Sequence, residues 1–150
     1  MQHGSLVRNP ADLLLHDHFH QKDLFADYER LVPGERTQKA ELIRRITDEL
    51  QLHFRIEERL LYPSLLATKS KAVLELVKTA RSEHRAILDA CRILARADDK
   101  DQDRLMKALF KQVEVYVGFE EKRLLPRIQR LPGVTLRQMT LEMEEMKGKR

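Results

Sequence analysis

Two segments of the sequence repeat one unusual pattern of polar residues. The first, His53 to Pro63, reads H-F-R-I-E-E-R-L-L-Y-P, and the second, Tyr116 to Pro126, reads Y-V-G-F-E-E-K-R-L-L-P. In both, an imidazole or phenol comes four residues before the first of two glutamates, and a proline follows six residues after that glutamate. Residues four apart on a helix project from the same face. Each segment could therefore present two ligands to one metal ion, and a second copy on another helix could supply the facing half of a cage.

The composition indicates a single all-helical domain. The chain has 150 residues, which is a usual size for one domain. Charged residues make up 35% of it and aromatic residues only 5%, and there is no tryptophan. Such a composition favours amphipathic helices around a leucine-rich core over a sheet, which would be richer in aromatic residues.

The sequence also disfavours several classes of protein. The net charge of +4 comes from well-mixed signs, and the only basic cluster is the C-terminal M-K-G-K-R, so no nucleic-acid partner is expected. The single cysteine, Cys91, cannot form an internal disulfide and fits a reducing compartment. No apolar run is long enough for a signal peptide or a membrane span. We therefore expect a cytoplasmic protein without a membrane partner.

Hydrophobic periodicity and capping residues predict the helices. Asn9 is the expected N-cap of the first helix and Thr37 that of the second, residues 98–101 form a turn, and Thr135 with Gln138 forms a capping box. Pro63 is expected to end or kink the second helix. The predicted helices cover about residues 10–31, 37–63, 71–97, 102–130 and 136–146.

Short loops between long amphipathic helices predict an up-down-up-down four-helix bundle. The bundle would comprise residues 9–130, and residues 131–150 would add a short C-terminal helix and a basic tail. Met139, Met143 and Met146 fall on one side of that last helix. This side could pack against the bundle or against another subunit, so a homodimer is left open.

Polar residues interrupt the apolar stripe of every long helix. Burying an unpaired carboxylate costs several kcal/mol, and burying an imidazole or phenol without a partner costs about 1–3 kcal/mol. We therefore expect these groups to converge, and nitrogen and oxygen ligands without cysteine favour iron, manganese or zinc. Two carboxylates placed to bridge favour two metal ions. The predicted ligands are His18, His53, Glu57, His84, Tyr116 and Glu120.

Taken together, these residues resemble the hemerythrin-like, HHE cation-binding domain family. Four motifs occur in order, namely Asp17-His18, the segment His53 to Pro63, Glu83-His84 and the segment Tyr116 to Pro126. The resemblance implies a four-helix bundle that holds a non-haem di-iron centre with an oxo or hydroxo bridge. It also implies a small-molecule partner, namely oxygen, peroxide or nitric oxide. Five of the predicted ligands match ligand positions of the family, and Glu57 and Glu120 would be the bridging carboxylates.

The sequence departs from the family pattern at two places. Tyr116 stands where the family has a histidine, and Ala80 and Leu88 flank His84 where hemerythrins proper carry a second imidazole. The second difference leaves a coordination position open. A Tyr116 phenolate would favour ferric iron, which suits redox sensing or peroxide handling better than reversible oxygen carriage. The alternative for Tyr116 is a buried phenol that is hydrogen-bonded to a carboxylate.

The favoured function is therefore a metal-binding protein that binds or senses oxygen or a related small oxidant. A di-iron enzyme of peroxidase or catalase type is the main alternative, and an iron-binding or iron-sensing protein is another. Zinc or manganese could fill the same site. A third class is a metal-free interaction module in which the six polar groups are hydrogen-bonded to one another.

Overall fold

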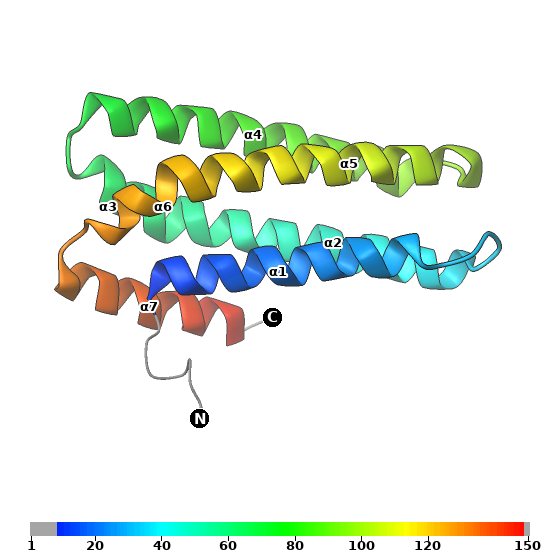
Figure 1. Ribbon diagram of the computed structural model, residues 1–150, viewed down its shortest axis with the longest axis horizontal. Helices are drawn as coiled ribbons and strands as arrows, with labels where there is room; N and C mark the ends of the chain where they lie inside the picture. The colour runs from blue at the N-terminus through cyan, green and yellow to red at the C-terminus, as the bar shows by residue number, and fades with distance from the viewer. Residues whose placement is uncertain (1–8, 149–150) are drawn as a thin grey trace.

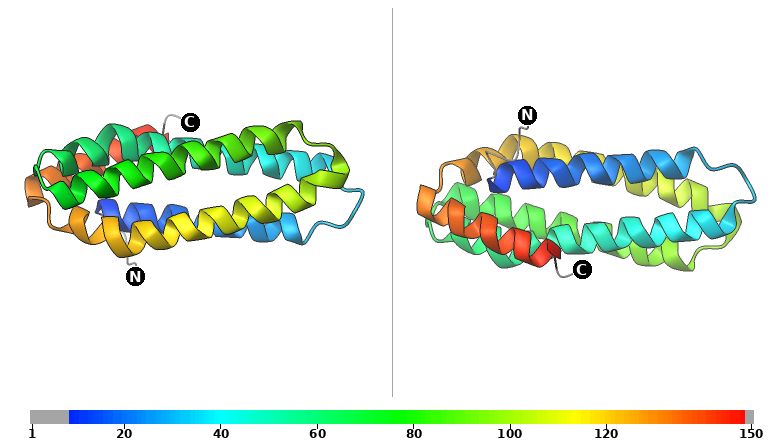
Figure 2. Two further views of the ribbon diagram at one scale, coloured as in Figure 1. Left: turned by 90° about the horizontal axis from the view of Figure 1, so that it is seen from above. Right: turned by 90° about the horizontal axis from the view of Figure 1, so that it is seen from below.

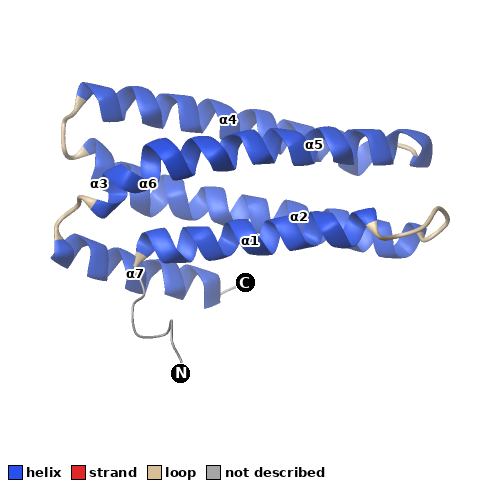
Figure 3. Cartoon of the chain, in the orientation of Figure 1, coloured by secondary structure: helices blue, strands red, loops and turns tan. Residues whose placement is uncertain are grey.

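The computed structural model describes residues 9–148, and within this range the chain forms helices and no strand (Figure 3). Four long helices lie side by side along the longest axis, and successive ones run in opposite directions (Figures 1 and 2). The prediction of an all-helical protein is confirmed. The final two residues of the predicted basic tail lie outside the described range. The long helices are α1 (Pro10–Glu29), α2 (Arg36–Ile56), α4 (Lys71–Arg96) and α5 (Asp99–Phe119).

The first helix begins as its sequence predicts. The side chain of Asn9 accepts a hydrogen bond from the backbone N–H of Asp12 at 2.9 Å, and Pro10 occupies the first helical position. Proline suits this position because its missing N–H would have no helical partner there. The cap fixes the start of α1, the helix that carries His18.

The second helix begins earlier than predicted. α2 starts at Arg36, and the side chain of Glu35 accepts a hydrogen bond from the backbone N–H of Val32 at 2.8 Å. The backbone carbonyl of Glu35 accepts from the N–H of Lys39 at 3.0 Å. Thr37 therefore lies inside the first turn, and its prediction as the N-cap is wrong.

Both copies of the repeated segment change helical type at the glutamate. α2 passes into the π-helix η2 (Glu57–Leu61), and α5 passes into η3 (Glu120–Leu124). Each π-helix is followed by a short α-helix, α3 (Tyr62–Leu66) or α6 (Leu125–Gln129), with its proline in the first turn. Proline clashes with the carbonyl four residues earlier, and a wider π turn relieves that clash. The two prolines thus alter the helix at the glutamate rather than ending it.

Two other helix starts differ from the prediction by a few residues. α5 begins at Asp99, so the predicted turn of residues 98–101 is shorter than expected. The last helix, α7 (Gly133–Gly148), also begins early, because the carbonyl of Pro132 already accepts from the N–H of Leu136 at 3.0 Å. Thr135 therefore lies inside the first turn, and the predicted capping box does not form the helix start.

α7 packs along one end of α1 and α2 (Figures 1 and 2). Met139 and Met143 are buried, whereas Leu141 on the other side of the helix is 63% exposed. The methionine side therefore packs against the bundle of the same chain. This contact accounts for the methionines without a second subunit.

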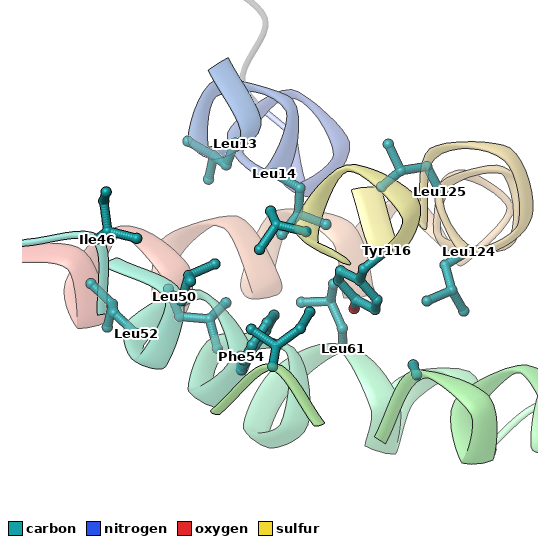
Figure 4. Packing of buried hydrophobic residues seen from close by; sticks show 14 of the residues in the cluster. Leu13, Leu14, Ile46, Leu50, Leu52, Phe54, Leu61, Tyr116, Leu124 and Leu125 are labelled. Atoms are coloured by element: carbon teal, nitrogen blue, oxygen red, sulfur yellow. The ribbon is translucent and has the colours of Figure 1, made fainter. Parts of the chain in front are cut away.

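The core is continuous along the bundle and encloses the polar groups of interest. Figure 4 shows Tyr116 among apolar side chains from several helices, including Leu14, Phe54, Leu61 and Leu124. Cys91 is buried in the same core, as a small apolar residue would be. Across residues 9–148, no helix combines the length and the apolar character that crossing a membrane requires.

Replacing Met143 by alanine tests the docking of α7. Its side chain is fully buried, so Met143→Ala should lower the free energy of unfolding by about 2–5 kcal/mol. Leu141→Ala is the matched control, because it removes an exposed side chain from the same helix and should change that free energy by less than about 0.5 kcal/mol. Urea denaturation measures both. Equal effects of the two substitutions would contradict the observed packing of α7.

Candidate metal centre

The six residues predicted as metal ligands meet at one place in the interior. All six are buried, and the most exposed of them, His18, is only 7% exposed. The long helices carry the histidines and the tyrosine, while the two glutamates are the first residues of the π-helices. The residues brought together are His18, His53, Glu57, His84, Tyr116 and Glu120.

One half of the cluster lies between α1, α2 and η3. Nε2 of His18 is 2.6 Å from Oε1 of Glu120, and Nε2 of His53 is 3.2 Å from the same oxygen. Ligand atoms of these three residues all lie within 4.8 Å of one another. Such spacing would let two imidazole nitrogens and a carboxylate oxygen surround one cation.

The other half lies between α4, α5 and η2. Nε2 of His84 is 2.9 Å from Oε1 of Glu57 and 2.8 Å from the hydroxyl of Tyr116. The Tyr116 hydroxyl donates to Oε1 of Glu57 at 2.8 Å or to Oε2 of Glu120 at 3.0 Å. One imidazole, one phenol and carboxylate oxygens therefore converge here.

Both carboxylates reach from one half of the cluster to the other. Glu120 directs Oε1 toward His18 and His53 and Oε2 toward Tyr116. Glu57 directs Oε1 toward His84 and Tyr116, and its Oε2 lies 3.4 Å from Nε2 of His53. Each glutamate thus has one oxygen for each half, which is the arrangement that a bridging carboxylate requires.

Each histidine of the cluster is held from outside by a further carboxylate. Nδ1 of His18 donates to Glu121 at 2.7 Å, and Nδ1 of His53 donates to Asp17 at 2.9 Å. An ionised carboxylate can only accept, so Nδ1 is the donor in each of these contacts and Nε2 of each ring points into the cluster. His84 follows the same rule, because its Nδ1 donates to Glu58 at 2.7 Å. These outer carboxylates orient the rings as partners of metal-binding histidines do.

Burial and mutual charge displace the pKa values of the cluster. Burial alone would lower the pKa of His53, but the negative charges of Glu57 and Asp17 and their hydrogen bonds raise it to about 9. Burial alone would raise the pKa of Glu57, but the charges and hydrogen bonds of His53 and His84 lower it to about 2. Burial and the charge of Glu57 raise the pKa of Tyr116, so without a metal its phenol stays protonated.

Two features of the donor set are compatible with a metal cation. Burial and the nearby charge of His53 lower the pKa of His18, which favours the neutral ring. Nε2 of a neutral ring that donates through Nδ1 carries a lone pair toward a carboxylate oxygen of Glu120 at 2.6 Å, and a shared proton or a metal cation would relieve their repulsion. In addition, Oε2 of Glu57 is buried without a hydrogen-bond partner. A buried polar atom of this kind calls for a specific partner, and a cation would supply one.

The sequence patterns did not single out two neighbours of the cluster. The hydroxyl of Tyr62 lies 3.1 Å from Nε2 of His84 and 3.2 Å from the hydroxyl of Tyr116. The ring of Phe54 stacks on His84 with ring centroids 4.0 Å apart. Tyr62 is not part of the repeated pattern, because its counterpart in the second copy is Leu125. Phe54 reads as an ordinary core residue of α2.

A cleft of about 330 Å³ leads from the surface to one edge of the cluster. It lies between α1 and α5, and His18 and Glu121 form part of its wall. Gly118 also lines it, and no atom lies within 4 Å of the position that a Cβ would take there. Most of the remaining wall is apolar, with Leu15, Phe25, Phe110, Val113 and Val117 among the lining residues.

Comparison with known proteins places the chain in a family. The sequence model of the Hemerythrin HHE cation binding domain matches residues 9–128. A crystal structure of a hemerythrin HHE cation binding domain-containing protein from Mycobacterium kansasii is similar, with a TM-score of 0.78 and 23% identity over 95% of this chain and 90% of that one. A search of curated proteins found no match. The family match covers most of the chain and includes every residue of the cluster, so the chain belongs to the hemerythrin HHE cation binding domain family.

Proposed function

We propose that this chain holds a non-haem di-iron centre inside an up-down-up-down four-helix bundle and uses it to bind or sense oxygen or a related small oxidant. The observation that carries the proposal is the placement of Glu57 and Glu120, each of which has one oxygen in either half of the cluster. Two carboxylates arranged in this way suit two metal ions better than one. Membership of a cation-binding family supports the same conclusion.

The proposed ligands divide between the two halves of the cluster. His18 and His53 would hold one ion, and His84 and Tyr116 the other, with Glu57 and Glu120 shared between them. The ions would supply Lewis acidity and redox chemistry. Nitrogen and oxygen donors without thiolate suit iron, although zinc or manganese could occupy the same positions.

A metal-free interaction module explains the cluster less well. Such a module needs well-formed hydrogen bonds for every buried polar group, yet Oε2 of Glu57 has only a 3.4 Å ion-pair contact with His53. It also gives no reason for three histidines to point Nε2 inward while carboxylates hold Nδ1 outside. A pair of cations accounts for both features.

The cleft between α1 and α5 supports a small-molecule partner. It approaches the cluster beside His18, and its apolar wall suits an uncharged diatomic molecule or hydrogen peroxide. The side chain of Glu121 is 39% exposed and holds Nδ1 of His18, so it lies between solvent and the cluster. A small oxidant could therefore approach the centre without unfolding the bundle.

Tyr116→Phe tests the role of the phenol. In protein reconstituted with ferric iron, a Tyr116 phenolate should give a broad visible charge-transfer band, and the substitution should abolish it. Tyr62→Phe is the matched control, because it removes the neighbouring hydroxyl 3.2 Å away and should leave the band in place. Absorption spectra recorded with iron analysis distinguish the two. A band that survives Tyr116→Phe at unchanged iron content would rule out this tyrosine as a ligand.

The affinity for ferrous iron should rise with pH. Iron must displace the proton that His53 carries below its pKa of about 9, and a Tyr116 phenolate requires the loss of a second proton. Glu57 has a pKa of about 2 and is ionised at neutral pH, so it adds nothing to the pH dependence of the affinity. Between roughly pH 6.5 and 8.5, the overall association constant for binding both ions should increase by about two powers of ten per pH unit, one for each proton.

Anaerobic competition titrations against a chelator measure this dependence. Tyr116→Phe should reduce the slope to about one power of ten per pH unit, because only the His53 proton is then displaced. An affinity that does not change with pH would contradict the proposed ligand roles of both residues.

Filling the cleft should slow the approach of a small oxidant. Gly118→Leu places a side chain in the cleft and should slow the reaction of the reduced, iron-loaded protein with hydrogen peroxide by roughly tenfold, a barrier change of about 1.4 kcal/mol. Val115→Leu is the control, because this residue is 65% exposed and does not line the cleft. Stopped-flow absorption measures the rate.

The same reaction separates binding or sensing from catalysis. A binding or sensing protein should consume peroxide in proportion to its iron and then stop. Continued turnover well above that of free iron would instead favour the peroxidase or catalase-like alternative. The observation that favours this alternative is the pair of hydroxyls of Tyr62 and Tyr116 beside His84, because both phenols have raised pKa values and could hold protons near the reacting molecule.

A further inference from the structure

The last turn of α7 lies outside the matched residues and contacts Asp17, the carboxylate that holds His53. The family match ends at residue 128, whereas α7 spans Gly133–Gly148. The ammonium group of Lys147, near the end of α7, forms an ion pair with Oδ1 of Asp17. The two side chains are only 16% and 7% exposed. A helix outside the matched residues thus contributes a largely shielded positive charge to the carboxylate that holds His53.

A continuous chain of contacts links this lysine to the cluster. The second oxygen of Asp17, Oδ2, accepts from Nδ1 of His53 at 2.9 Å. Nε2 of the same ring lies 3.2 Å from Glu120 and 3.4 Å from Glu57. Lys147 therefore contacts the carboxylate that orients one proposed ligand, and it does so without contacting a proposed ligand itself.

Asp17 differs from the other two carboxylates that hold histidines. The side chains of Glu58 and Glu121 are 45% and 39% exposed. Asp17 is buried, and burial alone would raise its pKa, but the hydrogen bonds and charges of His53 and Lys147 lower the pKa to about 2. The buried carboxylate thus depends on its two cationic neighbours, whereas the other two are partly open to solvent.

α7 contacts the bundle at more than one place near the cluster. Met139 and Met143 anchor the helix in the core, and α7 also packs against η2, the segment that begins at Glu57. One helix therefore touches both the carboxylate behind His53 and the segment that carries a proposed bridging ligand. A change in the docking of α7 would therefore affect both Asp17 and η2.

We propose that Lys147 is a positioning residue that acts on the metal centre through Asp17 and His53, so that the docked α7 tunes the reduction potential of the bound metal. This inference rests on the proposed function. The ammonium group of Lys147 partly neutralises the negative charge of Asp17. Without it, Asp17 would attract the Nδ1 proton of His53 more strongly, and the ring would become a stronger donor that favours the oxidised metal.

Lys147→Met tests the proposal, with Lys147→Arg as the conservative variant. The methionine variant should lower the midpoint potential of the iron-loaded protein by ~59 mV. For a one-electron step, this shift corresponds to about a tenfold change in the redox equilibrium. The arginine variant keeps the charge and should stay close to the parent. Spectroelectrochemical titration measures the potential.

The same substitution in an Asp17→Asn background separates a relay from a general charge effect. The four proteins form a double-mutant cycle. If Lys147 acts through the carboxylate, Lys147→Met should shift the midpoint potential in the parent. In the Asp17→Asn protein, the same substitution should change the redox equilibrium by less than about twofold. An equal shift in both backgrounds would mean that the lysine acts only as a distant charge, and it would overturn the proposal. An unchanged potential in Lys147→Met, or an equal shift in Lys147→Arg, would overturn it as well.

A metal-free measurement distinguishes failure of this inference from failure of the proposed function. In chelated protein, the proton NMR signal of His53 Nδ1–H should move downfield in Lys147→Met and stay in place in Lys147→Arg. If the parent takes up no iron, the proposed function fails, while this signal still shows whether Lys147 controls the contact between Asp17 and His53. If the parent takes up iron and the signal does not move in Lys147→Met, the inference alone fails.

Discussion

The structure depends on the burial of two carboxylates at one point inside an all-helical protein. Glu57 and Glu120 are at most 1% exposed, and leaving such groups without cationic partners would cost several kcal/mol each. Three histidines and a tyrosine surround them, and Oε2 of Glu57 has only a 3.4 Å ion-pair contact with His53 and no hydrogen bond. The arrangement of the surrounding helices follows from this requirement, because each long helix must bring at least one polar side chain to the same place.

The two prolines and the last helix help to meet that requirement. Pro63 and Pro126 each follow a π turn that begins at one of the buried glutamates, so the same local distortion occurs on both sides of the cluster. Wide helical turns of this kind are frequent at functional sites. α7 packs against α1, α2 and η2 and supplies the positive charge of Lys147 to the carboxylate that holds His53.

Most of the fold and the inner cluster could be predicted from the sequence, because both follow from helical periodicity. A histidine or glutamate on an apolar stripe must face the interior, and this placed His18, His53 and His84 together before any contact was known. Tyr62 could not be found in this way, because a tyrosine on such a stripe resembles any core residue. The contact between Lys147 and Asp17 joins residues 130 positions apart in sequence, and no local pattern encodes it. The start of α7 was missed because Thr135 resembled a cap while the helix had already begun at Gly133.

We propose that the buried cluster holds two iron ions. Anomalous diffraction at the iron edge, from crystals of protein purified in air, tests it most directly. The account predicts two iron peaks per chain, one beside His18 and His53 and the other beside His84 and Tyr116, with Glu57 and Glu120 reaching both. Crystals without an anomalous peak, in which these six side chains are hydrogen-bonded only to one another, would contradict it.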